Sequence, residues 1–245
     1  MNLVLIEAAE LGPDGRAILG GSRAGHMLTV LRVTVGARVR IGVIDGAIGV
    51  GEVIGIHGAR VELRCTLGEV PPRPRIDLLL ALPRPKVLGR LYASLAQLGI
   101  GRLILTNAAR VERFYFDAHQ LEPAFRRAQL LEGLAQARDT HVPSVTVHKS
   151  LRALVEDELD SMVPGARRLI ADPGAHGSVR QACAGLGASE RVLLAIGPEG
   201  GWNDFERELL GAHAFQAIGL GPRTLRSDVA TIALLSVAAD TIENG

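Results

Sequence analysis

The sequence predicts an α/β protein in which a small β-barrel precedes a larger domain built on a parallel sheet. Short strands separated by glycines fill about the first 70 residues, a proline-rich stretch follows, and strands then alternate with helices. The 245 residues, of which 47% are apolar, suffice for two ordinary domains with cores of their own. We therefore expect a first domain at residues 1–72 and a second at residues 73–245.

The first domain is predicted to consist of short antiparallel strands. In residues 38–44, arginine or glycine alternates with valine or isoleucine, which is typical of a strand. Asp45-Gly46 after them is a strong hairpin signal. Residues 47–56 and 60–67 give two further strands, joined by a turn at residues 57–59. Seven arginines balance seven acidic residues in this domain, so its net charge does not indicate a nucleic-acid partner. A solvated barrel face is the simpler explanation of these charges.

Beyond the proline-rich residues 69–75, the order of elements is typical of a parallel sheet. Residues 76–82 form a continuous apolar run, as in strands that are buried on both faces. Leucines at positions 88, 91, 95 and 98 have helical spacing, and Gly99 ends that helix. The other expected elements are strands at residues 102–106, 144–147 and 168–171 and helices at residues 120–137, 151–159 and 178–184.

The last quarter of the chain predicts a ligand site. An apolar strand at residues 192–196 runs into the glycine-rich loop 197–201, and a second strand at 215–220 runs into the loop 221–228. Ligands of open α/β sheets bind beyond the carboxyl ends of the strands, where glycines let backbone groups approach. Gly-Pro pairs also merely turn a chain, but two such loops before an apolar helix at residues 229–239 favour a site. Between the loops, Asn203 and Glu206 match a capping box that starts a helix.

Both loops resemble signature loops of the RsmE family. Gly197-Pro198-Glu199-Gly200-Gly201 matches intact, and residues 132–138 resemble a further family segment, with Ala135 and Ala137 replacing a Glu and a Ser. The second loop departs from the family pattern at Thr224, Ser227, Asp228 and Val229. RsmE enzymes belong to the SPOUT superfamily and methylate N3 of a uridine in 16S ribosomal RNA. The resemblance therefore implies a PUA-like RNA-binding barrel, a SPOUT domain with a trefoil knot, a homodimer, and S-adenosylmethionine as methyl donor.

Three strand-end loops are expected to converge on this cofactor and to hold it largely through backbone groups. Ile196, Leu220 and Leu225 offer an apolar slot that suits adenine. The candidate cofactor-binding residues are Leu82, Ile196, Gly197, Pro198, Glu199, Gly200, Gly201, Leu220, Gly221, Arg223 and Leu225.

Methylation of N3 requires that the N3 proton be removed and that the developing anion be stabilised. Arg226 is the candidate stabiliser, and Glu199 or Asp228 is the candidate proton acceptor. A purely structural ion pair between Arg226 and Asp228 is the alternative. The uridine must be presented unpaired, and the candidate RNA contacts are His26, Arg32, Lys86, Arg110 and Arg138. Each of these is otherwise explained as an ordinary surface charge.

Several other classes of protein are disfavoured. The seven histidines and two cysteines lack metal-ligand spacing, so we expect no metal. No uncharged apolar run approaches the ~20 residues of a membrane span, and no basic region precedes the first apolar run as in a signal peptide, so we expect a cytoplasmic protein. Two rival functions stay open: a SPOUT enzyme acting on another RNA or atom, and an inactive ribosome-associated RNA-binding protein. The second rival is motivated by Gln97, Ala135, Ala137 and Val229.

Overall fold

The computed structural model describes residues 3–244, which divide into two compact units. The first unit contains the chain up to Arg73 together with Leu131–Val142, and the second contains Pro74–Leu130 and the chain from Pro143 onward. The break between Arg73 and Pro74 lies in the proline-rich stretch. Residues 131–142, which the sequence-based division assigns to the second domain, pack with the first unit.

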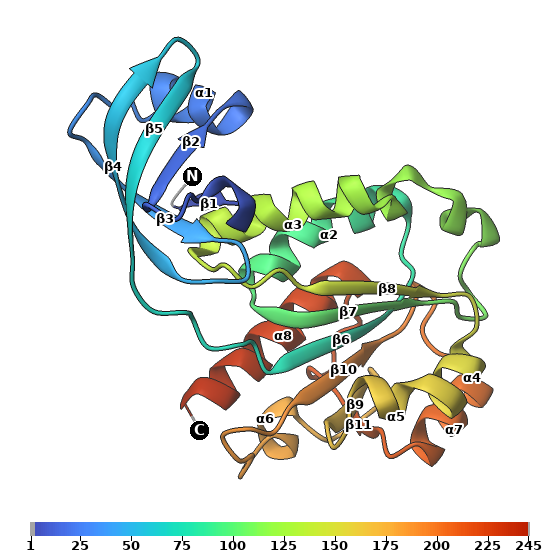
Figure 1. Cartoon of the computed structure of the whole chain (residues 1–245). Helices are drawn as coiled ribbons and strands as arrows, with labels where there is room; N and C mark the ends of the chain where they lie inside the picture. Colours follow the sequence, from blue (N-terminus) through green and yellow to red (C-terminus); the bar gives the residue numbers. More distant parts are fainter. Residues whose placement is uncertain (1–2, 245) are drawn as a thin grey trace. The chain divides into compact units, whose positions relative to one another are not determined.

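The first unit is built on a five-stranded sheet in the order β1-β3-β4-β5-β2 (Figure 1). These strands are β1 Val4–Ile6, β2 Arg16–Leu19, β3 Arg38–Val43, β4 Ile48–His57 and β5 Arg60–Leu67. The first pairs in parallel with β3, and all other pairs are antiparallel. Within residues 3–244, β1 and β2 are edge strands, so the small barrel that the sequence predicts is a half-barrel sheet. Its core includes Ile6, Leu19, Met27, Ile41, Val53 and Leu63.

A helix interrupts this unit where only strands were expected. Helix α1 spans Gly21–Thr29, and a 3-10 turn spans Ala8–Glu10. The helix buries only Ala24 and Met27, three residues apart on one face. Two buried positions give too weak a periodic signal to reveal a helix of this length.

The β3–β4 turn explains why residues 131–142 belong to the first unit. Asp45 has the left-handed φ of 56° that such a turn needs, which confirms the hairpin predicted there. Its carboxylate accepts a hydrogen bond from Val142 N at 3.0 Å, and Thr140 Oγ1 donates to Gly46 O at 2.6 Å. Leu3 N also donates to Ala135 O at 3.0 Å. These bonds hold the segment against β1 and β3.

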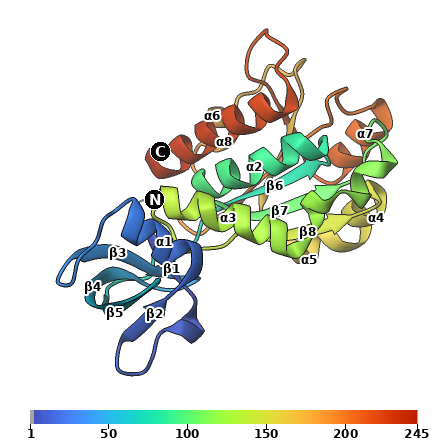
Figure 2. The same cartoon turned by 90° about the horizontal axis from the view of Figure 1, so that it is seen from above.

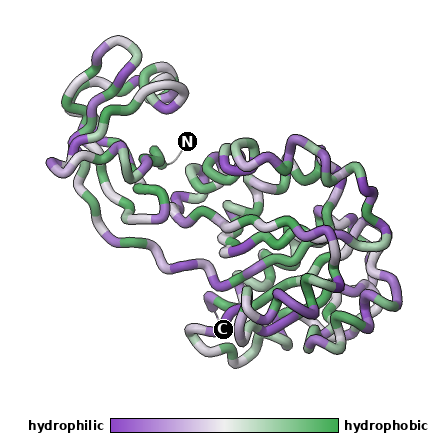
Figure 3. Tube along the Cα trace, turned by 45° about the vertical axis from the view of Figure 1, so that its right-hand side comes forward, coloured by the Kyte–Doolittle hydropathy of each residue, from purple (hydrophilic) through white to green (hydrophobic). Residues whose placement is uncertain are grey.

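The second unit contains a six-stranded sheet in the order β11-β9-β10-β6-β7-β8, with every pair parallel. The strands are β6 Ile76–Ala81, β7 Ile100–Thr106, β8 Ser144–His148, β9 Arg167–Ala171, β10 Val192–Ile196 and β11 Gln216–Ile218. All residues of β6 and β10 are buried, and hydrophobic segments run through the middle of this unit in Figure 3. The predicted parallel sheet is confirmed, because continuous apolar runs mark strands that are covered on both faces.

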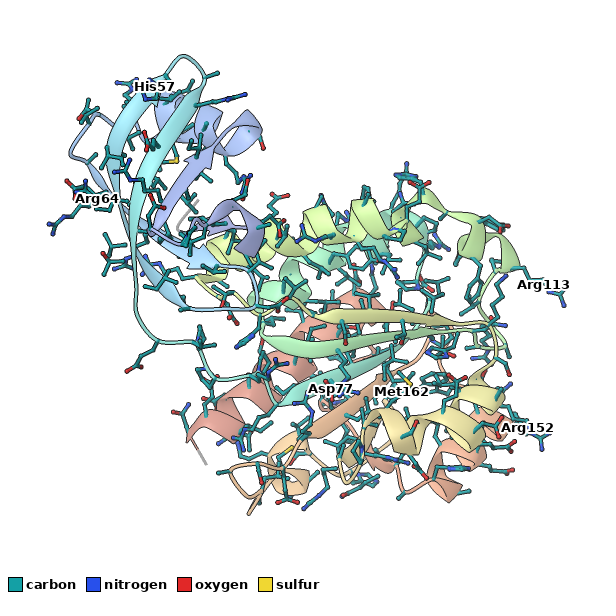
Figure 4. The ribbon with its side chains drawn as sticks, viewed as in Figure 1. His57, Arg64, Asp77, Arg113, Arg152 and Met162 are labelled. Atoms are coloured by element: carbon teal, nitrogen blue, oxygen red, sulfur yellow. The ribbon has the colours of Figure 1, made fainter. Side chains whose placement is uncertain are left out.

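One charged residue lies inside this apolar sheet. Asp77, labelled on β6 in Figure 4, is completely buried and is paired with Arg191 at 2.6 Å. The same guanidinium donates to Pro74 O at 2.9 Å. This pairing satisfies the carboxylate, whose burial alone would be costly.

Helices α2 Pro85–Gln97 and α8 Ser227–Asn244 contact each other and the central strands, and Figure 2 shows them side by side. The other helical segments are α3 Pro123–Ala137, α4 Leu151–Ala153, a π-helical turn Leu154–Glu158, α5 Leu159–Met162, α6 Val179–Ala182 and α7 Asp204–Ala212, with 3-10 turns at Arg113–Asp117 and His119–Leu121. Helix α8 buries Leu234, Leu235 and Ala238, but Val229 and Ile232 are 47% and 40% exposed. None of the helices in residues 3–244 is long and apolar enough to cross a membrane.

Candidate cofactor-binding site

A cavity of about 450 Å³ lies in the second unit, beyond the carboxyl ends of β9 and β10. We call it the glycine cavity, because residues 197–201 form much of its wall. Residues 171–173 after β9, residues 196–202 after β10 and parts of residues 224–230 line it, together with Arg110 and Arg207. Its volume lies in the range of roughly 300–1,000 Å³ that is usual for small-molecule sites. Its place at the strand ends is the usual one for a ligand in an open parallel sheet.

At several positions of this wall, a side chain larger than that of glycine would not fit. A Cβ on Gly197 would lie 3.1 Å from Trp202 Nε1, and one on Gly200 would lie 2.6 Å from Arg110 Cδ. Gly201 has a φ of 75°, which favours glycine. The loop therefore packs its own backbone against neighbouring side chains, and its remaining backbone surface borders the cavity.

Trp202, the only tryptophan of the chain, follows the glycine loop directly and also lines the cavity. It is 3% exposed, and its indole Nε1 has no hydrogen-bond partner within residues 3–244. Buried indole N–H groups normally find an acceptor. An unused donor beside a cavity of this size fits a bound ligand that carries polar acceptor atoms.

The two arginines of the cavity wall already bind the protein backbone. Arg110 Nη1 donates to the carbonyl of Gly200, which fixes the glycine loop from the segment that follows β7. Arg207 Nη1 donates to Trp202 O at 2.6 Å, and its other terminal nitrogen pairs with Asp204. Both guanidiniums therefore shape the wall of the cavity and are not free charges within it.

The acidic residues of the wall are also hydrogen-bonded. Asp172 Oδ1 accepts from Gly174 N at 3.0 Å, and Glu199 Oε1 accepts from Arg84 N at 3.4 Å. Glu199 Oε2 has no hydrogen bond within the part of the chain that the structure describes. No group of three or more His, Cys, Asp or Glu in residues 3–244 is placed to hold a metal ion.

Glu206 connects the start of α7 with the segment after β7. Its carboxylate accepts from Ala109 N at 2.6 Å and from Asn203 N at 2.9 Å, while Asn203 Oδ1 accepts from Glu206 N at 2.8 Å. The predicted capping box is thus confirmed. It places the helix start directly behind the glycine loop and Trp202.

Residues 71–239 match the family described as the RNA methyltransferase domain. The chain belongs to this family. It is 29% identical over 254 residues to the ribosomal RNA small subunit methyltransferase E of Treponema pallidum, covering 97% of this chain and 90% of the relative. It is 26% identical over 230 residues to the protein of that name in Mycobacterium bovis, covering 92% and 87%. The chain is thus an RsmE-family member.

A solved RsmE structure has the same fold. The crystal structure of ribosomal RNA small subunit methyltransferase E from Neisseria gonorrhoeae, bound to S-adenosyl methionine, aligns with a TM-score of 0.77 at 19% identity. The alignment covers 98% of each chain. The half-barrel sheet and the parallel sheet therefore both belong to the architecture of RsmE proteins.

The structure brings most of the candidate cofactor residues of this RsmE-family chain to two neighbouring cavities. A smaller cavity of about 50 Å³ shares five lining residues with the glycine cavity: Ala171, Asp172, Pro173, Leu225 and Ala230. Leu82 lines neither cavity; it is buried, and its N–H donates to Thr106 O at 2.8 Å. Ile196, Gly197, Pro198, Glu199, Gly200, Gly201 and Leu225 line the glycine cavity, and Leu220, Gly221, Arg223 and Leu225 line the smaller one.

The candidate catalytic residues lie at the start of α8 and in the glycine loop. Arg226 and Asp228 flank Ser227, which lines the cavity, and they form an ion pair at 2.9 Å. The Arg226 side chain is 70% exposed. This contact is the ion pair considered as the structural alternative, and it leaves most of the guanidinium open to solvent.

The candidate RNA contacts are divided between the two units, with Lys86 and Arg110 in the second and His26, Arg32 and Arg138 in the first. Arg110 is part of the glycine cavity, and Lys86 is exposed near the start of α2. His26 lies on α1, and its Nε2 is buried without a hydrogen-bond partner among the described residues. Arg32 and Arg138 line a separate cavity of the first unit.

The residues of the glycine cavity that sequence reasoning missed are Ala171, Asp172, Pro173, Trp202, Arg207, Thr224, Ser227 and Ala230. A sequence signal for residues 171–173 was present. Asp172-Pro173-Gly174 follows a predicted strand, just as the loops 197–201 and 221–228 do. Trp202 carried no such signal, because its burial beside Gly197 depends on the folded loop.

Proposed function

We propose that this chain transfers a methyl group from S-adenosylmethionine to N3 of a uridine in 16S ribosomal RNA. The observation that carries the proposal is the glycine cavity, where both loops predicted from the sequence meet beside the unsatisfied N–H of Trp202. Membership of the RNA methyltransferase family and the names of the relatives support the reaction and the class of RNA. We propose uridine N3 as the atom because the loop motifs resemble those of RsmE enzymes.

The residues of the cavity suit this cofactor. Backbone groups of residues 197–201 bind its polar atoms, and the Trp202 N–H supplies one further donor. Ile196 and Leu225 provide apolar surface for the adenine ring. When bound, S-adenosylmethionine supplies an electrophilic methyl group on its sulfonium.

Residues around the cavity have distinct roles in the proposed reaction. Arg226 stabilises the negative charge that develops on the uracil ring when N3 loses its proton. Glu199 is the better proton acceptor, because its Oε2 is unengaged among residues 3–244. Asp228 instead uses one oxygen to bind Arg226 and the other to accept from Val229 N at 3.0 Å. Asp228 therefore orients Arg226, and the uridine is presented unpaired, since N3 lies on its pairing edge.

We also propose the remaining features that the RsmE resemblance implies. The half-barrel acts as a PUA-like RNA-binding domain, and the last segments of the second unit form the trefoil knot of SPOUT enzymes. The chain forms a homodimer that covers the exposed Val229 and Ile232 of α8, because apolar side chains on a largely apolar helix are stabilised by burial.

Two measurements test the proposed function. S-adenosylmethionine is titrated while the fluorescence of Trp202 is recorded, and small-subunit RNA lacking this modification is then incubated with enzyme and cofactor. We expect a saturable change in fluorescence, followed by N3-methyluridine in the mass spectrum of the digested RNA. A different methylated nucleoside would identify another target atom. Cofactor binding without methylation, or no binding at all, would favour the inactive RNA-binding protein.

A further inference from the structure

A second cavity, of about 430 Å³, lies in the first unit and is lined by four arginines: Arg32, Arg38, Arg40 and Arg138. We call it the arginine cavity. No aspartate or glutamate is among its lining residues. All four side chains belong to exposed residues, so the guanidiniums are accessible from solvent.

Three of the four arginines lie close together in the sequence, and the fourth, Arg138, comes from a distant segment. Arg38 and Arg40 occupy alternate positions on β3 and so share one face of the sheet. Arg32 lies between α1 and β3, and Arg138 follows α3. These last two have left-handed φ values of 50° and 62°, which are uncommon for residues other than glycine. Both residues follow the end of a helix, where a single left-handed residue commonly terminates the helix, and backbone bonds from Val33 N to Met27 O and from Asp139 N to Leu134 O close these two ends.

Within residues 3–244, none of the four guanidiniums has an ion pair or a hydrogen bond. Glu52 is the cross-strand neighbour of Arg38, but its carboxylate pairs with Arg64, at 3.9 Å. Asp139, next to Arg138, accepts from Thr140 N at 2.6 Å and from His141 N at 3.1 Å. Other carboxylates of the first unit are used by other arginines: Glu10 by Arg23, and Asp14 and Glu62 by Arg16.

Four guanidiniums around one cavity repel one another unless an anion lies between them. Their planar forks match phosphate oxygens, which accept two parallel hydrogen bonds. The four guanidiniums are exposed and border an open concavity, so they are spread over its wall. A chain of phosphates can contact all of them, whereas one small anion can contact only some.

We infer that the arginine cavity binds successive phosphates of a single-stranded RNA segment. The choice of RNA as the source of the phosphates rests on the proposed function, whereas the anion site itself does not. The contacts are sequence-independent and position the RNA, so the identity of the methylated base is determined elsewhere.

The test compares two double variants of the full chain that each remove two positive charges from one sheet. Arg38→Gln/Arg40→Gln changes the arginine cavity, and Arg60→Gln/Arg64→Gln changes β5, outside it (Arg64 is labelled in Figure 4). Binding of a fluorescent oligouridylate is measured over a range of salt concentrations, with inorganic phosphate as competitor. The fluorescence titration of Trp202 with S-adenosylmethionine reports on the second unit in every variant.

We expect the cavity variant to bind the oligonucleotide at least about tenfold more weakly. Its plot of log affinity against log salt should flatten by about 0.7 for each lost phosphate contact. The matched variant should change neither quantity by a comparable amount, and cofactor affinity should be the same in all three proteins. Arg38→Lys/Arg40→Lys should recover the salt slope but only part of the affinity, because lysine keeps the charge without the fork.

Three results would overturn the inference: equal weakening in both double variants, no weakening in the cavity variant, or no binding of the oligonucleotide by the wild-type chain. Competition by inorganic phosphate at concentrations as low as those of the oligonucleotide would show a small-anion site instead of a strand site. Failure of the methylation assay with these binding results intact would reject the proposed function but leave the phosphate site standing.

Discussion

The two units each contain a cavity of similar volume, about 450 and 430 Å³, but the walls have opposite chemistry. In the glycine cavity, every charged side chain of the wall is bound to the protein or paired, and backbone surface is exposed at the glycines. In the arginine cavity, four guanidiniums have no partner among residues 3–244. A backbone wall selects one small molecule by shape and hydrogen bonding. A wall of free charges suits a polymer whose repeating phosphates are alike.

The largest expected effect concerns Arg226, the proposed stabiliser of the developing anion in the second unit. Arg226→Ala should lower kcat for RNA methylation by about a hundredfold or more, because one preorganised donor to a developing anion contributes that much. The affinity for S-adenosylmethionine, read from Trp202 fluorescence, should change little, since Arg226 does not line the glycine cavity.

Arg152→Ala is the matched control for that variant. Arg152, labelled on α4 in Figure 4, is 67% exposed and is paired with Glu156 at 3.0 Å, much as Arg226 is paired with Asp228. Its kcat should equal that of the wild type. Unchanged turnover in Arg226→Ala would remove Arg226 from the mechanism and leave only the structural ion pair.

The next effect concerns the backbone wall. Gly197→Val should weaken S-adenosylmethionine binding by at least about tenfold, because its Cβ would lie 3.1 Å from the indole of Trp202 and push the ring out of place. Gly211→Ala on α7, where no atom lies within 4 Å of the new Cβ, should leave binding unchanged. Calorimetry measures both affinities, and equal affinities would contradict the steric account of the wall.

Salt should separate the two cavities in the wild-type chain. The affinity for single-stranded RNA should fall with a log–log slope of about −3 if all four arginines contact phosphates, at ~0.7 for each contact. The affinity for S-adenosylmethionine should change little over the same range, because backbone groups are not screened as free charges are. Equal slopes of log affinity against log salt for the two ligands would contradict the proposed difference between the cavities.

The smallest effect concerns a carboxylate that keeps one arginine occupied. The Arg23 guanidinium holds the pKa of Glu10 below its usual value. The stabilisation by this pair is therefore present at neutral pH and is lost in acid, as the pH falls through the lowered pKa of Glu10. Glu10→Gln should reduce the free energy of unfolding at neutral pH by less than about 1 kcal/mol, and the difference from wild type should shrink in acid. Urea unfolding at several pH values measures this, and a difference that grows in acid would contradict the assigned sign.

Elements that depend on contacts between residues close in the sequence could be predicted, whereas those that depend on contacts between distant residues could not. Strands β6 and β10 were visible because burial on both faces leaves an unbroken apolar run. The Asn203–Glu206 capping box and the Asp45 turn were visible because their bonds join residues close in the sequence. Helix α1 was missed because it buries only two side chains. The packing of residues 131–142 with the first unit was missed because it depends on hydrogen bonds to Leu3 and Asp45, which are distant in the sequence.

The sites divide in the same way. Glycines after apolar strands identified two walls of the glycine cavity, because parallel strands bring their carboxyl ends to one edge. The role of Arg110 in fixing that wall, and the burial of Trp202 within it, depend on contacts that no local pattern contains. Arg110 binds a carbonyl ninety residues away in the chain.

Periodicity and glycine placement are local properties, so they were enough to predict two parts, a parallel sheet and the loops that meet at the glycine cavity. Which charges of the first unit neutralise each other depends on folding. The seven arginines and seven acidic residues of residues 1–72 sum to zero in any arrangement, whereas folding pairs Glu10 with Arg23, and Asp14 and Glu62 with Arg16. The same fold brings Arg138, from residues 131–142, beside Arg32, Arg38 and Arg40, so that a stretch of sequence without net charge contributes three arginines to a cationic cavity.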